Sequence, residues 1–474
     1  MDTDLTTLGN AFTPLSEANK GKSGILPLRL AKDAFAARMI LADTAERSLD
    51  IQYYIWHQDT TGTLLFDSLR AAADRGVRVR LLLDDFNTMG MDPILKNLDD
   101  HQNIEIRLFN PFLIRSHRWV GGLTDFQRLN RRMHNKSFTA DNQVTIIGGR
   151  NVGDEYFGFG TDLLFADLDV LAVGTLVKDV SRDFDRYWIS DSSYPVKLIL
   201  KNIKAEVDVA AAAKKIRGQD DTRFFLDAVR SFNVVEELKQ KRLDLEWAST
   251  YMISDDPAKG LGKAASKGSL LQRLKNEMGP AERRMDIVSP YFVPTEQGVE
   301  AFSKLRAKGI KIRVLTNALE ATDAGVVHAG YAKYRKSLLR LSVELFEFRN
   351  PMTRHKTKDF GKGSSQTSLH AKTIAIDGNR VFIGSFNFDP RSNDLNTELG
   401  FIIESSTLAQ QIQAVFDHRA GQQAYEVRLA PDNKLYWIGL RDGNDVKHKQ
   451  EPGTSYWQRL GIKVLGWLPI EWLL

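Results

Sequence analysis

The chain has 474 residues, enough for two or three domains, and its 42% hydrophobic and 26% charged residues exclude a disordered or fibrous protein. It has no cysteine, which excludes disulfides, thiol nucleophiles and thiolate metal sites. The formal net charge of +5 permits contact with phospholipid surfaces or nucleic acid but requires neither.

The N-terminus reads MDTDLTTLGNAFTPL, with early acidic residues and no apolar run. A secretory signal peptide needs a basic start followed by an apolar stretch, so we expect none. No run of about 20 apolar residues occurs, and the sequence therefore predicts no membrane-spanning helix. We expect a protein that is soluble or bound to one membrane face.

The first half alternates predicted helices and strands. Helical spacing over residues 34–47 leads into an apolar strand, LDIQYYIW, at 49–56. Residues 63–76 form a second predicted helix that ends at Gly76, and VRVRLLLD at 77–84 has the pattern of a buried strand. Strands that alternate with helices predict an α/β sandwich in each half of the chain.

These elements recur later in the chain. ERSLDIQYYIW at 46–56 is repeated as ERRMDIVSPYF at 282–292, so that Glu46 and Glu282 are 236 residues apart. Between segments 70–83 and 304–315 the offset differs from 236 by three residues. Between segments 134–151 and 370–387 it is again 236. Two separate stretches with one offset indicate a gene duplication.

The repeated segments each contain a histidine and a lysine two residues apart, His134 with Lys136 and His370 with Lys372. On a strand this spacing places both side chains on one face. A lysine can neutralise a phosphoryl group while a histidine attacks or transfers a proton, so the pair suits phosphodiester chemistry. A single His-x-Lys is more often a surface accident, but two copies in one setting favour a catalytic role over packing.

An aspartate follows each pair, Asp141 in the turn ADNQ and Asp377 in the turn DGN. Both turns lie between two apolar strands of a predicted hairpin. Their distance from the histidines argues against direct chemistry, so we expect these aspartates to fix the hairpins and orient nearby basic groups.

Each hairpin ends in small residues and an asparagine, at 148–151 and 384–387. Small residues allow a ligand to approach the backbone, and the amides of Asn151 and Asn387 could donate to a phosphate oxygen.

A carboxylate is expected to orient each histidine through its second ring nitrogen. Glu398, in LNTELG, is the candidate for His370. Asp167, in FADLDV, is the candidate for His134, although the offset drifts by five residues there and Asp169 competes.

These residues resemble the signature of the phospholipase D superfamily, H-x-K-x4-D-x6-G-[GS]-x-N, and both copies fit it. The resemblance implies two α/β halves about a pseudo-twofold axis, with a His-Lys-Asn set from each half in one active site. It also implies a two-step reaction through a phosphohistidine without metal or cofactor. By family precedent His134 is the nucleophile and His370 the general acid/base, a choice that the sequence alone leaves open.

Within the superfamily, segments 48–62, 131–157, 326–339 and 466–474 look like the bacterial cardiolipin synthases that lack N-terminal membrane spans, the C type. This resemblance implies transfer of a phosphatidyl group from phosphatidylglycerol or phosphatidylethanolamine to phosphatidylglycerol. The donor, the oligomeric state and any protein partner are not readable from the sequence.

The C-terminal segment 455–474 concentrates Trp457, Trp467 and Trp472 among aliphatic residues. Tryptophan at the end of an apolar stretch favours a membrane interface, although packing on the protein surface is the alternative. Two clusters of basic residues precede the motifs and would suit an anionic bilayer: Arg128, Arg131 and Arg132, and Arg354, Lys356, Lys358 and Lys362. His328 and Tyr331 are candidates either for a headgroup pocket or for packing.

The expected organisation is a first phospholipase D-like half at 1–199, a connection with an opening strand at 200–265, a second half at 266–420 and a tail at 421–474. The partners expected are phospholipids and, through the tail, a membrane, with no nucleic acid. The expected location is the cytoplasmic face of the bacterial inner membrane, as a peripheral protein.

The alternatives differ in chemistry and in class. A phospholipase D hydrolase would share the fold, as would a nuclease, but a nuclease would favour a strongly basic groove. An inactive membrane-bound scaffold would have lost a motif histidine or lysine, and neither is replaced. A metal-dependent alcohol phosphotransferase is disfavoured because no D-x2-D-G-x2-A-R pattern occurs.

Overall fold

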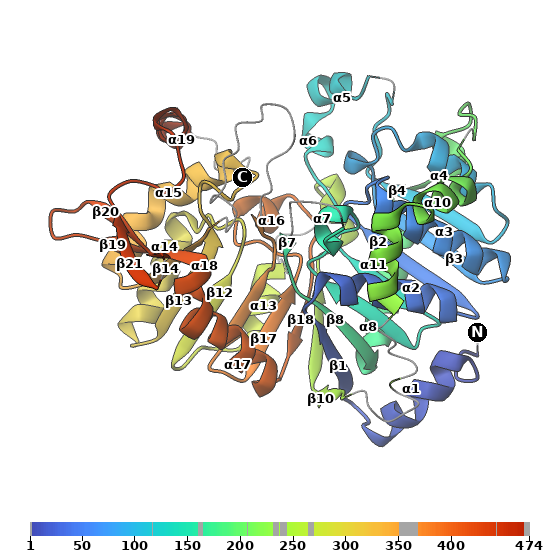
Figure 1. The fold of residues 1–474 in the computed structure, drawn as a ribbon, viewed down its shortest axis with the longest axis horizontal. Coiled ribbons are helices and arrows are strands. Elements are labelled where there is room, and N and C mark those ends of the chain that lie inside the picture. The colour runs from blue at the N-terminus through green and yellow to red at the C-terminus, as the bar shows by residue number, and fades with distance from the viewer. Residues whose placement is uncertain are drawn as a thin grey trace. The chain divides into compact units, whose positions relative to one another are not determined.

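The computed structural model describes residues 2–115, 117–159, 165–205, 207–230, 237, 244–263, 270–349, 368–441 and 443–468. The chain divides into two compact units (Figure 1). Unit 1 comprises Met1–Thr161, Leu168–Leu270 and Leu395–Phe401, and unit 2 comprises Asp162–Asp167, Leu271–Asp394 and Ile402–Leu474. Each unit therefore includes one short segment from the other half of the sequence.

Unit 1 is built on a nine-stranded mixed sheet with the order β10-β1-β8-β6-β5-β2-β3-β4-β9. Its strands are β1 (Ser23–Leu28), β2 (Ser48–Tyr53), β3 (Arg78–Asp84), β4 (Ile104–Phe109), β5 (Ser137–Ala140), β6 (Val144–Gly148), β8 (Asp169–Gly174), β9 (Ser193–Pro195) and β10 (Glu246–Ala248). Strands β2, β3 and β4 are parallel, and the other pairings are antiparallel.

The helices of unit 1 are α1 (Thr7–Ala18), α2 (Ala31–Thr44), α3 (Thr60–Asp74), α4 (Asp92–Asp99), α5 (Arg118–Thr124), α6 (Phe126–Leu129), α7 (Asp154–Phe157), α8 (Thr175–Trp188), α9 (Val196–Ile199), α10 (Val209–Arg217) and α11 (Asp220–Arg230). Helices α2 and α3 pack together, and their apolar faces join the buried core of the sheet. As the sequence predicts, α3 ends just before Gly76, whose φ of 93° suits glycine.

Unit 2 contains a sheet of the same kind, with the run β17-β16-β12-β13-β14-β19-β20-β21. Its strands are β12 (Arg284–Val288), β13 (Lys311–Asn317), β14 (Glu344–Phe348), β16 (Thr373–Ile376), β17 (Arg380–Gly384), β19 (Ala424–Leu429), β20 (Leu435–Arg441) and β21 (Asn444–His448). A separate parallel pair joins β7 (Phe165–Ala166) to β15 (Ser368–Leu369). Strand β18 (Leu399–Ile403) begins in unit 1 and ends in unit 2, and β11 (Thr250–Ser254) belongs to unit 1.

The helices of unit 2 are α13 (Leu270–Met278), α14 (Thr295–Ala307), α15 (Gly325–Arg340), α16 (Pro390–Asp394), α17 (Ser406–Ala414), α18 (Ala420–Gln423) and α19 (Tyr456–Trp467). Helix α19 packs against α15. Among the described residues, no helix has both the length and the hydropathy needed to cross a bilayer.

The two sheets repeat one register. In unit 1, β2 pairs with β5 so that Leu49 faces Ala140. In unit 2, β12 pairs with β16 so that Met285 faces Ile376, and both of these residues lie 236 positions after their counterparts. The duplication found in the sequence is thus confirmed as two α/β units whose central strands align residue by residue.

Two segments outside the halves expected at 1–199 and 266–420 extend the sheets. Strand β10, from the connection at 200–265, pairs with β1 and so extends the sheet of unit 1. Strands β19 to β21, from the tail at 421–474, extend the sheet of unit 2. In the described part of this tail, residues 449–468, which include α19, follow the last strand and lie outside the sheet.

Candidate active site

The first motif histidine is held by a segment from the far end of the sequence. Met133 and Thr397 form a parallel bridge within unit 1, and the backbone N–H of His134 donates to the carbonyl of Thr397 at 2.8 Å. This pairing places the side chain of Glu398 beside the imidazole, with 3.1 Å between His134 Nδ1 and Glu398 Oε1. The Glu398 side chain is fully buried, so its negative charge acts on the histidine with little screening.

Glu398 is itself fixed by Asp255, at the end of β11. The Asp255 carboxylate accepts the Glu398 backbone N–H at 3.1 Å, and the Asp255 N–H donates to the Glu398 carbonyl at 2.9 Å. Burial raises the pKa of Asp255, and the ammonium of Lys259, 2.8 Å away, opposes that effect. These contacts set the position of the glutamate before any substrate binds.

The second motif histidine has an equivalent environment in unit 2. Leu369 pairs with Ala166, and the His370 N–H donates to the Ala166 carbonyl at 2.9 Å. The buried Asp167 carboxylate then lies 2.6 Å from His370 Nδ1. A carboxylate at Nδ1 favours the tautomer that leaves Nε2 free for attack on phosphorus or for proton transfer.

The pairing of carboxylates with histidines is therefore the reverse of the sequence-based expectation. Glu398 lies on His134 and Asp167 on His370, because the segments that carry the carboxylates cross into the opposite units. The competing candidate, Asp169, is buried on β8 and forms an ion pair with Arg38 at 2.8 Å.

Both motif lysines are buried, with 4% of their surface exposed. Lys136 donates to the backbone carbonyl of His134, and Lys372 donates to that of His370 at 2.5 Å. Each motif lysine is thus tied to the backbone of its own histidine. Contrary to expectation, both His-Lys pairs precede their strands, since β5 begins at Ser137 and β16 at Thr373.

The motif aspartates lie in the hairpin turns, where both have a positive φ, 49° for Asp141 and 54° for Asp377. The Asp141 carboxylate accepts the backbone N–H groups of residues 46–48, and the Asp377 carboxylate accepts those of residues 282–284. Each aspartate thus ties its hairpin to the start of the neighbouring central strand, and these contacts support a structural role.

The two motif asparagines differ in their side-chain hydrogen bonds, and the glycine of the first motif lies against neighbouring backbone. Asn151 accepts the Ile55 N–H at 3.1 Å and donates to the Tyr156 hydroxyl at 3.1 Å. Asn387 is buried, and its side-chain oxygen has no hydrogen-bond partner among the described residues. A Cβ on Gly148 would lie 2.6 Å from the Leu168 carbonyl oxygen, so the glycine allows this close approach of the backbone.

Three residues considered for contact with lipid lie in the interior. Arg132 is fully buried, 3.2 Å from Asp84. His328 and Tyr331 are also buried, and they contact Glu451 and Glu347 respectively, which supports the packing alternative. The basic cluster at 354–362 and Trp472 lie outside the described residues.

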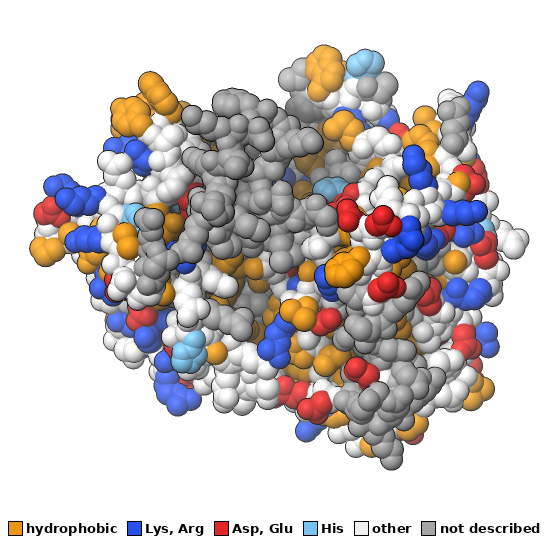
Figure 2. All heavy atoms as spheres, in the orientation of Figure 1, with side chains coloured by type: hydrophobic (Ala, Val, Ile, Leu, Met, Phe, Trp, Pro, Cys, Tyr) orange, Lys and Arg blue, Asp and Glu red, His pale blue; other side chains and the backbone are white. Residues whose placement is uncertain are grey.

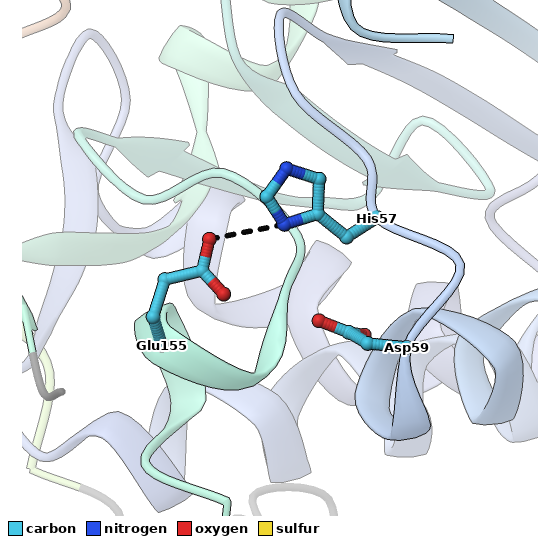
Figure 3. A group of neighbouring side chains, drawn as sticks. All are labelled: His57, Asp59 and Glu155. Carbon is cyan, nitrogen blue, oxygen red and sulfur yellow. Dashed lines mark ion pairs between the residues drawn. The ribbon is translucent and has the colours of Figure 1, made fainter. Parts of the chain in front are cut away.

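Outside the motifs, His57, Asp59 and Glu155 form a second polar cluster (Figure 3). Their side-chain nitrogen and oxygen atoms that could bind a metal ion lie within 4.8 Å of one another. Protein contacts account for the cluster. The Asp59 carboxylate accepts the N–H groups of Gly62 and Asp154 at the starts of α3 and α7, and His57 pairs with Glu155 at 3.0 Å. The donor types would suit a metal ion, but these bonds already serve to join two helix ends.

Two further residues contact His134 that the sequence did not single out. The Tyr54 ring lies 4.1 Å from the imidazole, centroid to centroid, and the Asn396 amide nitrogen is 3.3 Å from Nε2. Neither belongs to the repeated signature, since Tyr54 aligns with Pro290 at the offset of 236. Only the folded chain brings them to the motif.

This arrangement of paired histidines and lysines agrees with the match to known proteins. The family described as "Cardiolipin synthase, PLD-like domain" matches residues 39–188 and 274–420, and the chain belongs to this phospholipase D-like family. The expected family is therefore confirmed.

Individual proteins match this chain over most of their lengths. Cardiolipin synthase C of Escherichia coli (strain K12) is 50% identical over 470 residues, which cover 98% of this chain and 99% of the relative. An uncharacterized protein of Helicobacter pylori (strain ATCC 700392 / 26695) is 33% identical over 468 residues, 96% and 90% of the two chains. Phosphatidylserine synthase of Haemophilus influenzae Rd KW20 shares the fold, with a TM-score of 0.58, 14% identity and coverage of 87% and 91%.

Proposed function

We propose that this chain is a cardiolipin synthase, a phosphatidyltransferase that joins phosphatidylglycerol to a phosphatidyl group through a phosphohistidine. The observation that carries the proposal is the pair of motif histidines, each with a buried carboxylate at Nδ1. Membership of the cardiolipin synthase family and 50% identity to cardiolipin synthase C support the choice of substrate.

In the first step, Nε2 of His134 attacks the phosphorus of the donor phospholipid. The new N–P bond forms as the bond from phosphorus to the headgroup oxygen breaks, and His370 donates a proton to the leaving glycerol or ethanolamine. Glu398 stabilises the positive charge that develops on His134, as a buried carboxylate does for an attacking or proton-accepting imidazole.

In the second step, His370 accepts the proton of the incoming phosphatidylglycerol hydroxyl. The hydroxyl oxygen attacks phosphorus, and the N–P bond breaks with its electron pair returning to His134. Asp167 stabilises His370 while it is protonated. Lys136 and Lys372 offset the negative charge of the phosphoryl oxygens in both steps, and Asn387 is a candidate donor to one of these oxygens.

The enzyme would act as a peripheral protein on the cytoplasmic face of the bacterial inner membrane, with α19 in contact with lipid. Trp457, Leu460, Val464 and Trp467 form one stripe along this helix, and all four are exposed. The orange side chains over α19 are visible in Figure 2. The helix carries Arg459 and Lys463 but no acidic residue, which suits an anionic bilayer.

The test is to incubate the purified protein with phosphatidylglycerol vesicles, with and without phosphatidylethanolamine, in EDTA and to follow the lipids by mass spectrometry. Cardiolipin supports the proposal, and released glycerol or ethanolamine identifies the donor. Phosphatidic acid alone would make the chain a phospholipase D. Absence of any lipid turnover would contradict both the cardiolipin synthase and the phospholipase D. The remaining candidates would then be a nuclease and an inactive membrane-bound scaffold.

A further inference from the structure

Tyr54 contacts both side chains of the first motif. Its ring is 4.1 Å from the His134 imidazole, with an angle of 51° between the ring planes. The Lys136 ammonium nitrogen lies 5.7 Å from the centre of the same ring, within the range of a cation–π contact. One aromatic side chain thus borders the two groups proposed to act on phosphorus.

The backbone that carries Tyr54 is fixed on both sides. Tyr54 follows the last residue of β2, and its carbonyl accepts the Asn87 side chain at 3.4 Å. The next N–H, that of Ile55, donates to the motif residue Asn151 at 3.1 Å. The signature asparagine therefore helps to set the position of the tyrosine, although Tyr54 lies outside the signature.

The imidazole of His134 is confined by three side chains. Glu398 lies 3.1 Å from Nδ1, the Asn396 amide nitrogen lies 3.5 Å from Nδ1 and 3.3 Å from Nε2, and the Tyr54 ring lies against the imidazole. Such contacts limit rotation about the Cβ–Cγ bond and so limit the directions in which Nε2 can point.

We propose that Tyr54 is a positioning residue that fixes the direction of His134 Nε2 and thereby favours transfer to a bound alcohol over hydrolysis. The inference rests on the proposed function, with His134 as the nucleophile. In the transfer step, the acceptor oxygen forms its bond to phosphorus in line with the N–P bond that breaks. The acceptor proton passes to His370, and the electron pair returns to Nε2.

The direction of the N–P bond affects attack by a bound alcohol more than attack by water. A phospholipid hydroxyl held in the site approaches from one direction, so a tilted N–P bond slows its attack. Water, which gives phosphatidic acid by the same bond changes, can approach from more directions. Loss of the Tyr54 ring should therefore lower transfer more than hydrolysis.

The test compares Tyr54→Phe, Tyr54→Leu and Tyr54→Met, with Tyr194→Leu as the control on the edge strand β9. Cardiolipin and phosphatidic acid formed from phosphatidylglycerol vesicles are measured together with kcat and KM. We expect Tyr54→Leu and Tyr54→Met to lower kcat for cardiolipin about tenfold, about 1.4 kcal/mol in the barrier, with KM changed less than about twofold. The ratio of phosphatidic acid to cardiolipin should rise, while Tyr54→Phe and Tyr194→Leu stay near wild type.

Circular dichroism and thermal melting identify a variant that fails to fold, and having two aliphatic variants keeps the test decisive. A folded Tyr54→Leu or Tyr54→Met enzyme with wild-type kcat and product ratio would overturn the inference, as would equal losses in Tyr54→Phe. Wild-type enzyme that makes no cardiolipin would instead overturn the proposed function. In that case turnover of a soluble phosphodiester still reports on positioning, since loss in the aliphatic variants with retention in Tyr54→Phe would support it.

Discussion

His134 lies 3.1 Å from Glu398, a residue 264 positions later in the sequence, and both belong to unit 1. The same exchange occurs in unit 2, where Asp167 from the first half of the sequence contacts His370. The duplicated chain thus completes each histidine environment with a carboxylate from the opposite repeat.

Removal of either carboxylate charge should slow catalysis without unfolding the protein. We expect Glu398→Gln and Asp167→Asn each to lower kcat by about 10² to 10⁴, because the imidazole loses the group that selects its tautomer and stabilises its charged form. Steady-state cardiolipin formation measures the effect, and the exposed Glu404→Gln is the control. A variant that retained more than half of wild-type kcat would show that its carboxylate is dispensable.

Loss of the motif aspartates should act mainly on stability. Asp141→Asn and Asp377→Asn weaken three bonds from backbone N–H groups, and we expect a destabilisation of about 1.5–3 kcal/mol with a Tm lower by several degrees. Activity per folded molecule should stay within about twofold at a temperature where the protein is folded. The ion pair of the half-buried Asp179 with the exposed Arg182 supplies the control Asp179→Asn. An inactive but fully stable variant would assign the aspartates to chemistry instead.

The Asp377 contacts also have a pH signature. Burial raises the pKa of the Asp377 carboxyl, but the N–H donors of residues 282–284 outweigh burial and hold it below the ordinary value of 3.8. The stability that Asp377 contributes is therefore complete above about 3.8 and is lost as the pH falls through the lower folded value. Denaturant titrations between pH 5 and 2 should show a shallower loss of stability in Asp377→Asn than in wild type. Parallel curves would contradict this account.

The apolar stripe of α19 should contribute to membrane binding. Replacing Trp457 and Trp467 with serine should weaken sedimentation with phosphatidylglycerol vesicles about tenfold or more. Turnover of a short-chain, soluble phosphatidylglycerol should be unchanged, because the stripe makes no part of the chemistry. Phe224→Ser, which removes an equally exposed ring from α11, is the control. Unchanged sedimentation of the double variant would restrict α19 to its packing on α15.

His57 should titrate above its ordinary pKa. The hydrogen bond that the His57 imidazole donates to the Glu155 carboxylate raises the pKa of His57 and outweighs the burial that lowers it. The stabilisation from this pair is complete below pH 6.5 and is lost as the pH rises through the folded value. NMR titration of the imidazole, assigned with His57→Gln, should show a lower pKa in Glu155→Gln. A pKa that did not move would show that Glu155 has no influence on the imidazole.

The sequence was most informative where the fold is local. The offset of 236 correctly anticipated the register of the central strands, and the polar turns around Asp141 and Asp377 marked the hairpins. Both features depend on residues close together in the sequence, where strand period and turn preference are enough for prediction.

The carboxylate pairing was wrong because the prediction treated each repeat as complete in itself. Nothing in FADLDV or LNTELG indicates that these segments join the other unit, and their two backbone bridges exist only in the folded chain. Tyr54 was missed for a related reason: its partner His134 is 80 residues away, and the second repeat has Pro290 at that position. A tertiary contact that occurs in only one repeat produces no residue match at the offset of 236, so comparison of the repeats cannot reveal it.

Because the carboxylate segments are exchanged, neither repeat alone contains a complete histidine environment. A fragment ending at residue 199 would contain His134 without Glu398, and the remainder would contain His370 without Asp167. A mutation in either short segment changes the environment of the histidine in the other repeat. The two repeats therefore cannot change independently at these positions.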